Sequence, residues 1–333
     1  MIEHGGALDR AIAEFGGSRE IWLDLSTGIN PVAYPVPVFA SDIWARLPDS
    51  GLEKRALNAA RGYYGFEPDA GVVAAPGTQA LIQLYPHLAG PGDAVVIGPT
   101  YEEHAQSLGI AGRDVRYERA LSSIQDEDMI VVVVNPNNPD GKIIPADALV
   151  FAAERLAERG GLLVVDEAFA DTNGQDSVAK YAGMDGLIVL KSFGKFFGLA
   201  GARLGFVAGP KDITDIISAM LGPWAVSGPA LALAEKAYGD TSAIAQIKAD
   251  LKMRRVRLEA MFAKVEMQVS GGTDLFVLAR HFQASWIHQQ LCEKHILVRK
   301  FGYQADWLRF GLPGDDAGFE RLELALSEII FSI

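Results

Sequence analysis

The sequence predicts an α/β fold with a mostly parallel sheet, followed by a smaller α+β part. Strands and helices alternate between residues 72 and 208. Several of the strands, such as 129–134, are continuous apolar runs of the kind that is buried on both faces of a sheet. Beyond Pro210 the pattern changes to longer helical stretches. We therefore expect three parts: an N-terminal arm at 1–40, a large domain at 41–228 and a small C-terminal domain at 229–333.

The individual elements follow from periodicity and from turn residues. Pro31, Pro35 and Pro37 keep the end of the arm irregular. The expected helices are 7–15, 52–64, 79–89, 103–111, 146–159, 213–221, 230–238, 243–262, 284–294 and 318–330. The expected strands are 21–25, 72–75, 94–97, 114–117, 129–134, 161–165, 187–190, 204–208, 265–269, 274–279, 296–299 and 307–311.

Composition restricts the class of partner. The 333 residues carry a net charge of −12, which argues against nucleic acid, because phosphate backbones require clustered Lys and Arg. No apolar run is long enough to span a bilayer, and residues 1–6 lack a secretory pattern, so we expect a cytoplasmic protein without a membrane partner. The single Cys292 excludes an intrachain disulfide, and no Cys/His cluster has the spacing of a metal site.

One segment carries most of the chemistry. Residues 192–203 contain the amine of Lys195, a hydroxyl three residues earlier at Ser192 and a guanidinium eight residues later at Arg203. A lysine enclosed by the three phenylalanines of this segment loses hydration, which favours the free, nucleophilic amine. The alternative is a surface lysine in a glycine-rich loop. The neighbouring hydroxyl and guanidinium favour the nucleophile.

This segment resembles the lysine motif of fold-type I pyridoxal-phosphate enzymes. The resemblance implies pyridoxal 5'-phosphate as cofactor, Lys195 as the Schiff-base lysine, and Ser192 and Arg203 as ligands of the cofactor phosphate. It also implies the fold-type I transferase fold, in which the arm joins the small domain, and a homodimer. Gly194 departs from the pattern, because many members carry Ser or Thr directly before the lysine.

Two strand ends add phosphate and ring contacts. Gly77, Thr78 and Gln79 lie between a strand and a helix start, where free N–H groups and the helix dipole attract a phosphate. Tyr101 follows the strand at 94–97, and the resemblance implies that its ring stacks on the pyridine ring of the cofactor.

Two further strand ends supply polar side chains. The segment 135–141 is similar to the Asn-Pro-Asn-Asn-Pro-Thr-Gly loop of the family, with Asp140 in place of Thr, and implies that Asn138 donates to the 3' oxygen of the cofactor. Asp166 ends a buried strand, and a buried carboxylate requires a cationic partner. The pyridinium nitrogen is such a partner, which makes Asp166 a catalytic candidate beside Lys195.

Two alternative functions belong to other classes of protein. The strand and acidic pair at 162–167 also look like the Walker B strand of a P-loop ATPase, but the required G-x-x-x-x-G-K-[ST] is absent. A non-catalytic protein on the same fold is the other alternative. The joint presence of Lys195, Asp166, Asn138 and Arg203 argues against it.

Stretches outside the cofactor site indicate one branch of the family. Residues 4–6, 22–31, 222–227 and 296–301 are similar to the CobC family of cobalamin-biosynthesis proteins, related to threonine-phosphate decarboxylase. The resemblance implies decarboxylation of L-threonine O-3-phosphate to (R)-1-amino-2-propanol O-2-phosphate. A histidinol-phosphate-type aminotransferase is the alternative.

Substrate residues also follow from this resemblance. Arg309 is expected at the α-carboxylate of a phosphorylated amino acid, and Arg299 and His4 near its phosphate. Relatives place a tyrosine that reaches the partner subunit just before the position of Pro48. Leu47 stands there in this chain and cannot make that contact.

Overall fold

The computed structural model describes residues 5–172 and 176–331. The chain divides into two compact units. The smaller unit consists of Met1–Ala33, Pro139–Gly141 and Gln246–Ile333, and the larger unit of Tyr34–Asn138 and Lys142–Ala245. The outer boundaries lie at 34 and 246, whereas the sequence suggested 41 and 229.

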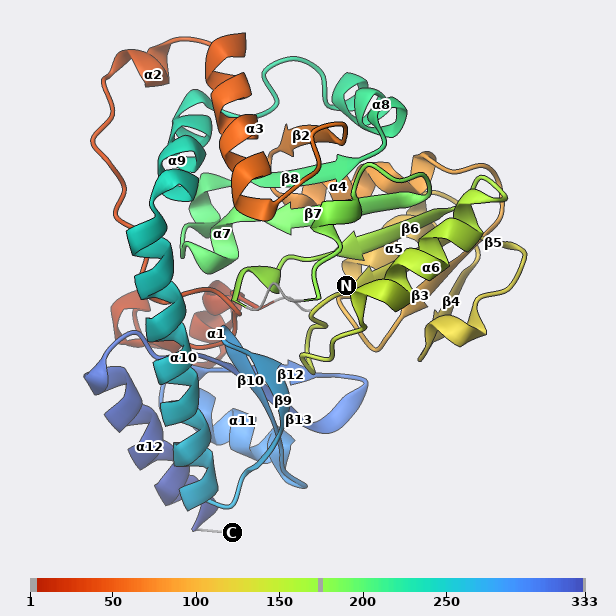
Figure 1. The fold of residues 1–333 in the computed structure, drawn as a ribbon. Coiled ribbons are helices and arrows are strands. Elements are labelled where there is room, and N and C mark those ends of the chain that lie inside the picture. The colour runs from red at the N-terminus through yellow and green to blue at the C-terminus, as the bar shows by residue number, and fades with distance from the viewer. Residues whose placement is uncertain (1–4, 173–175, 332–333) are drawn as a thin grey trace. The chain divides into compact units, whose positions relative to one another are not determined.

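The larger unit is built on a seven-stranded sheet (Figure 1). Only β8 runs antiparallel to its neighbours, so the sheet is mostly parallel, which confirms the predicted class. In spatial order the strands are β2 (Gly71–Ala75), β8 (Gly205–Gly209), β7 (Leu187–Ser192), β6 (Leu162–Asp166), β5 (Asp128–Val134), β3 (Asp93–Ile97) and β4 (Val115–Glu118).

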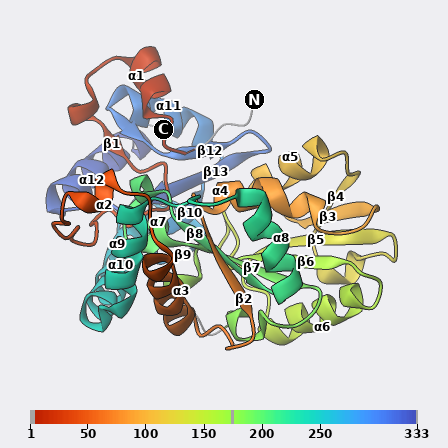
Figure 2. The same ribbon diagram turned by 90° about the horizontal axis from the view of Figure 1, so that it is seen from above.

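Helices cover both faces of this sheet, as Figures 1 and 2 show. Alternate residues of β5 serve the two faces, since successive side chains of a strand point in opposite directions. Val131 and Val133 pack in the core on the side of α6, whereas Ile130 and Val132 pack in the core that α4, α5 and α8 cover. The helices of this unit are α2 (Asp42–Ala45), α3 (Ser50–Tyr64), α4 (Thr78–Leu84), α5 (Glu103–Ile110), α6 (Ala146–Ala157), α7 (Phe193–Phe196), α8 (Lys211–Leu221) and α9 (Gly228–Gly239).

Several local features differ from the sequence expectation. The strand expected at 265–269 runs instead over Gln268–Thr273, and the one expected at 296–299 is divided into Ile296–Leu297 and Arg299–Phe301. The helix α4 ends at Leu84 instead of continuing to 89, because Pro86 has no N–H to donate to the helix; residues 85–87 form a 3₁₀ turn. The stretch at 21–25 is extended only over β1 (Leu23–Asp24). The four-residue helices α2 and α7 were not expected, since one turn shows no periodicity in the sequence.

The smaller unit is the predicted α+β part. Its four-stranded sheet is antiparallel throughout, and a separate parallel pair joins β1 to β11. In spatial order the sheet contains β12 (Arg299–Phe301), β13 (Gln304–Gly311), β10 (Phe276–Arg280) and β9 (Gln268–Thr273), and β11 is Ile296–Leu297. The helices are α1 (Leu8–Phe15), α11 (Ala284–Glu293), α12 (Asp316–Ile330) and most of α10 (Thr241–Lys264).

Residues 5–172 and 176–331 contain neither a membrane-spanning helix nor a cluster of metal-binding side chains. None of the helices there has both the length and the apolar character needed to cross a membrane. The same part of the chain holds no group of three or more His, Cys, Asp or Glu side chains arranged to bind a metal ion.

Candidate active site

The carboxyl ends of the parallel strands bring the predicted residues of the larger unit to one edge of its sheet. Tyr101 follows β3, Asn138 follows β5, and Asp166 and Ser192 are the last residues of β6 and β7. The end of β2 reaches the same edge, because Ala75 and Ser192 both pair with Gly205, the first residue of the reversed strand β8. The segment 77–79 after β2 and Arg203 before β8 therefore lie there too.

Asp166 is buried, and both oxygens of its carboxylate have hydrogen-bond partners. Its Oδ2 lies 3.0 Å from Nε2 of His104, and its Oδ1 accepts from the Ala168 N–H at 2.9 Å. A carboxylate only accepts, so Nε2 of His104 donates. Burial alone would raise the pKa of Asp166, but its hydrogen bond and charge interaction with His104, the Lys195 charge and the Ala168 N–H outweigh burial and lower that pKa. Asp166 is therefore an ionised carboxylate.

His104 was not assigned a role from the sequence. It lies on α5, fully buried, and its Nδ1 is 3.1 Å from the hydroxyl of Tyr85. The three side chains thus form a chain from Tyr85 through His104 to Asp166. The available signal was position: His104 comes three residues after Tyr101, at the start of the helix that follows β3.

The acidic residue next to Asp166 has a different partner. Glu167 forms a buried ion pair with Lys191 of β7, accepts from the Ser177 hydroxyl at 2.6 Å and accepts from the Val178 N–H at 2.7 Å. The Glu167 carboxylate is thus bound by groups of the protein itself. Of the acidic pair, Asp166 is the one that lies with His104 and Lys195.

Lys195 lies on the short helix α7 and is half-buried. Its Nζ is 5.1 Å from the centroid of the Phe169 ring. Phe193, Phe196 and Phe197 are fully buried, and Phe193 and Phe197 stack on each other with centroids 4.8 Å apart. The sequence predicted that these three rings enclose the amine; the ring whose centroid lies 5.1 Å from Nζ is that of Phe169.

Gly194 has a structural reason to lack a side chain. A Cβ at this position would lie 2.7 Å from Cα of Ala200, closer than real Cβ contacts. The backbone approach between α7 and residue 200 therefore excludes the Ser or Thr that related motifs carry there.

Groups that suit an anion lie together where α4 begins. Gly77, with a φ of +83°, precedes the first helical residue, Thr78. A Cβ on Gly77 would lie 2.7 Å from Nη2 of Arg203, so the glycine leaves room for that guanidinium beside the helix start. Ser192 pairs with Gly205 on the neighbouring strand. Free N–H groups, a guanidinium and a hydroxyl suit a phosphate.

Tyr101, which is predicted to contact the cofactor ring, is hydrogen-bonded to Gln79. The hydroxyl of Tyr101 donates to Oε1 of Gln79 at 3.4 Å, and Nε2 of Gln79 donates to Glu103 at 2.5 Å. The Tyr101 ring meets the His104 ring edge-on, with centroids 6.0 Å apart. Tyr101 is thus fixed between Gln79 at the start of α4 and His104, the partner of Asp166.

The Asn138 loop is held by its two other asparagines. Asn135 makes a pair of hydrogen bonds to the backbone of Ile144, at 2.8 and 3.0 Å. Nδ2 of Asn137 donates to the Pro99 carbonyl at 3.0 Å, which connects the loops after β3 and β5. The backbone on both sides of Asn138 is therefore constrained.

The predicted substrate residues lie in the smaller unit. Arg309 of β13 is buried, and its Nη2 donates to the Ser26 carbonyl at 2.7 Å. Arg299 of β12 is its register partner on the adjacent strand. Burial, and after it the charge of Arg299, lowers the pKa of Arg309 to about 10. His4 lies outside the residues that the structure describes.

Comparison with known proteins identifies the family of the chain. A curated threonine-phosphate decarboxylase from Sinorhizobium sp is 47% identical over 98% of both chains, and one from Pseudomonas aeruginosa is 41% identical over 98% of this chain and 97% of that one. The crystal structure of histidinol-phosphate aminotransferase from Sinorhizobium meliloti in complex with pyridoxal-5'-phosphate has the same fold, with a TM-score of 0.85, 22% identity, and coverage of 100% of this chain and 95% of that chain. The sequence profile named "Aminotransferase class I and II" matches residues 35–322. The chain therefore belongs to the aminotransferase class I and II family.

Proposed function

We propose that this protein is a pyridoxal-phosphate-dependent threonine-phosphate decarboxylase. The reaction converts L-threonine O-3-phosphate to (R)-1-amino-2-propanol O-2-phosphate and carbon dioxide, in cobalamin biosynthesis. The observation that carries the proposal is that Lys195, Asp166 and Arg203 belong to the same edge of one sheet. The two relatives at 47% and 41% identity carry the name of this activity.

The residues at this edge fit the cofactor in charge and in space. Gly77 leaves open the position beside the Arg203 guanidinium that a side chain would fill. We assign the cofactor phosphate to Arg203, Ser192 and the segment 77–79. We assign the ring to Tyr101, the 3' oxygen to Asn138 and the ring nitrogen to Asp166.

When bound, the cofactor supplies a protonated ring that accepts the electron pair left on the substrate's α-carbon as carbon dioxide departs. Asp166 holds the proton on the ring nitrogen, since its own carboxylate stays ionised. His104 positions that carboxylate. The Nζ of Lys195 supplies the amine that retains the cofactor, and it returns a proton to the α-carbon.

Two arginines of the smaller unit suit the two anionic groups of the substrate. We propose that Arg309 contacts the α-carboxylate and that Arg299, with His4, contacts the phosphate. Tight binding of the carboxylate stabilises the ground state that decarboxylation has to leave. The binding energy is therefore better used at the remote phosphate, and Arg309 serves mainly to orient the carboxylate.

Assembly and location are further parts of the proposal. We propose a homodimer in the cytoplasm, whose cofactor-binding domain is the larger unit and whose small domain is the smaller unit. Exposed apolar side chains of the larger unit support the dimer: Trp44, Leu47 and Trp224 are exposed, and Trp224 lines a cavity of about 430 Å³. Large exposed apolar groups mark interaction surfaces.

The test is a pair of incubations of the holoenzyme. With L-threonine phosphate we expect release of one carbon dioxide for each amino-propanol phosphate formed. With histidinol phosphate and 2-oxoglutarate we expect no glutamate. Rapid glutamate formation without carbon dioxide release from threonine phosphate would make the protein a histidinol-phosphate-type aminotransferase instead.

A further inference from the structure

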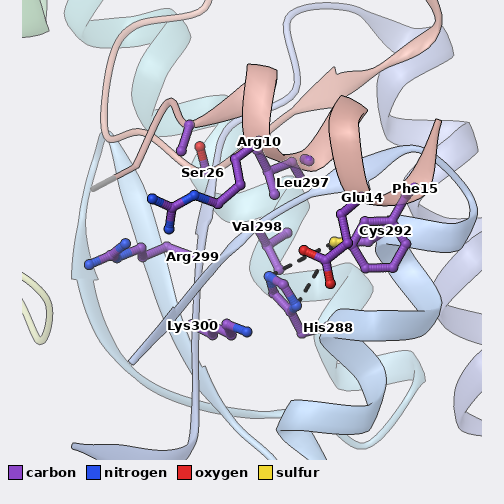
Figure 3. Close-up of a pocket in the computed structure, with 12 residues that line it drawn as sticks. Arg10, Glu14, Phe15, Ser26, His288, Cys292, Leu297, Val298, Arg299 and Lys300 are labelled. Atoms are coloured by element: carbon purple, nitrogen blue, oxygen red, sulfur yellow. Dashed lines mark hydrogen bonds between the residues drawn. The ribbon is translucent and has the colours of Figure 1, made fainter. Parts of the chain in front are cut away.

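A small cavity in the smaller unit carries an unusual density of positive charge. It has a volume of about 90 Å³ and lies where α1 faces α11 and the strands β11 and β12 (Figure 3). At roughly 30 Å³ for each water molecule, it holds about three waters, which is space for one phosphate-sized group. The polar and charged residues that line it are Arg10, Glu14, Ser26, His288, Arg299 and Lys300.

The two ends of this cavity differ in charge. Figure 3 shows the guanidinium groups of Arg10 and Arg299 on the same side, one from α1 and one from β12. Glu14 is the one carboxylate among the described lining residues, and it lies at the opposite end, beside Cys292 and His288. The Lys300 charge acts at that end as well, since it lowers the pKa of Cys292. The arginine end therefore attracts an anion.

The cysteine end has no nucleophile. The thiol of Cys292 is fully buried and 3.9 Å from both ring nitrogens of His288. Burial raises the pKa of this thiol to about 11, and the nearby carboxylates of Glu14 and Glu293 oppose its ionisation further. A neutral thiol does not attack a substrate at neutral pH. The Cys–His pair is thus a packing contact, and the chemistry of the cavity is in its cations.

Ser26 fixes the helix that carries Arg10. Its hydroxyl donates to Oδ1 of Asp24 at 2.6 Å and accepts from the Gly6 N–H at 2.7 Å, two residues before α1 begins. Its carbonyl accepts from Arg309 at 2.7 Å. The start of α1 and the arginine-bearing strand are therefore held by one residue. Because the hydroxyl proton is used on Asp24, recognition of an anion here depends on the guanidinium groups.

The neighbouring strands already bring two like charges together. Arg299 and Arg309 are direct partners in the register of β12 and β13, and like charges placed opposite each other destabilise a sheet. Arg10 adds a third guanidinium from a different element. In a protein of net charge −12, a cluster of three guanidinium groups suits an anionic ligand.

We propose that Arg10 is a specificity-determining residue that, together with Arg299, binds the phosphate group of a phosphate monoester in this cavity. This inference rests on the proposed function, which supplies a phosphorylated amino acid as substrate. Guanidinium groups bind phosphate oxygens in pairs and stay charged at all working pH values. Arg10 thereby selects the phosphorylated amino acid over the same amino acid without phosphate.

The test compares two variants of the holoenzyme that remove one positive charge from the same cavity. Arg10→Gln removes a cation from the proposed phosphate end, and Lys300→Gln removes one from the cysteine end. We expect Arg10→Gln to raise KM for L-threonine phosphate by about tenfold or more, the loss expected for one charge-assisted hydrogen bond. Turnover of unphosphorylated L-threonine should not change, and Lys300→Gln should leave both substrates unaffected. Arg10→Lys, which keeps the charge and loses the paired geometry, should fall between Arg10→Gln and wild type.

A second measurement does not depend on turnover. Calorimetric titration with inorganic phosphate should give at least tenfold weaker binding to Arg10→Gln than to wild type or Lys300→Gln, with all three unfolding at the same temperature. Equal phosphate affinity in the three proteins would overturn the inference, and so would equal losses in Arg10→Gln and Lys300→Gln. If wild type releases no carbon dioxide from threonine phosphate, the proposed function fails, while the phosphate titration still decides the role of Arg10.

Discussion

Asp166 shows how one buried carboxylate is kept charged without water. Moving a carboxylate into the interior favours its protonated form, and here that effect is outweighed by His104, Lys195 and a backbone N–H. Tyr85 supports the histidine from its other ring nitrogen. The ionised state of Asp166 is therefore a property of the fold, and it is established before any cofactor binds.

The pH dependence of stability should report this state. The folded pKa of Asp166 lies below its unfolded value of about 4, so its stabilising contribution is complete above that value and is lost as pH falls through the folded pKa. At pH 7 we expect Asp166→Asn to be less stable than wild type by roughly 1.5–3 kcal/mol, the worth of a hydrogen bond to a charged group. The difference in unfolding free energy should narrow as pH falls below about 4. Thermal unfolding of the cofactor-free proteins measures it, and a difference that does not change with pH would contradict the assignment.

Lys195 is the residue on which the covalent step depends. Borohydride reduction of the holoenzyme should fix the cofactor to the peptide that contains Lys195, as mass spectrometry would show. Lys195→Ala should show no fixed cofactor and should lose several orders of magnitude in rate, because its amine supplies the only covalent attachment. Lys180→Ala, which removes an exposed lysine of the same unit, is the control and should behave as wild type. If the cofactor were fixed to another lysine, the assignment of Lys195 as the cofactor-binding lysine would be wrong.

At the scale of elements, the start of α4 and the turn before β8 form one phosphate site. Gly77→Ala places a Cβ 2.7 Å from the Arg203 guanidinium and at a backbone φ of +83° that alanine rarely adopts. We expect the variant to retain cofactor at least tenfold less tightly, at a cost of about 1.4 kcal/mol or more. Gly62→Ala is the matched control, since a Cβ in that helix meets nothing within 4 Å. Equilibrium dialysis of the cofactor distinguishes the two, and equal retention would place the phosphate elsewhere.

The buried pair of Lys191 and Glu167 joins β7, the end of β6 and the loop at 177–178. Removing one partner leaves a buried charge without its counterion, which typically costs about 3–5 kcal/mol. We expect a loss of this order in Lys191→Met by urea unfolding. The double variant Lys191→Met/Glu167→Leu should recover much of it, because no buried charge remains. A double variant as unstable as the single one would show that the hydrogen bonds from Ser177 and Val178, and not the ion pair, carry the stability.

The elements that were predicted from the sequence share one property: their pattern is local. Continuous apolar runs predicted the strands β5 and β7. The residues that follow such strands could then be assigned to one site, because the strand ends of a parallel sheet meet at one edge. His104 was missed because its partner, Asp166, is 62 positions away and only the sheet brings them together. Arg10 was missed for the same reason, since its cavity is formed by strands near the other end of the chain. The sequence showed only that Gly194 lacks the hydroxyl of related motifs; the reason, the close approach of the Ala200 backbone, is visible only in the fold.

At the scale of the whole molecule, the net charge does not determine which ligands the individual sites attract. The chain carries a net charge of −12, yet each proposed anion site is lined by arginine: Arg203 in the larger unit, and Arg10, Arg299 and Arg309 in the smaller. At physiological ionic strength exposed charges are screened over about 8 Å, so an anion within a site meets the arginines there and little of the acidic surface. A negative net charge therefore argues against a nucleic-acid partner but not against a phosphorylated substrate.

The assembly of the whole molecule gives the last prediction. Trp224 is 60% exposed and lines the cavity of about 430 Å³, and Leu47, 65% exposed, directly precedes Pro48 in the same lining. We expect wild type to elute at twice the chain mass of 35.8 kDa in size-exclusion chromatography with light scattering. Trp224→Asn removes the indole but keeps a residue that tolerates the φ of 59° found there, and it should shift the protein toward monomer. Phe151→Ser removes an aromatic ring with a similar exposure of 61% from α6, and it should leave the dimer intact. An unchanged dimer in Trp224→Asn would show that the two subunits meet through another face.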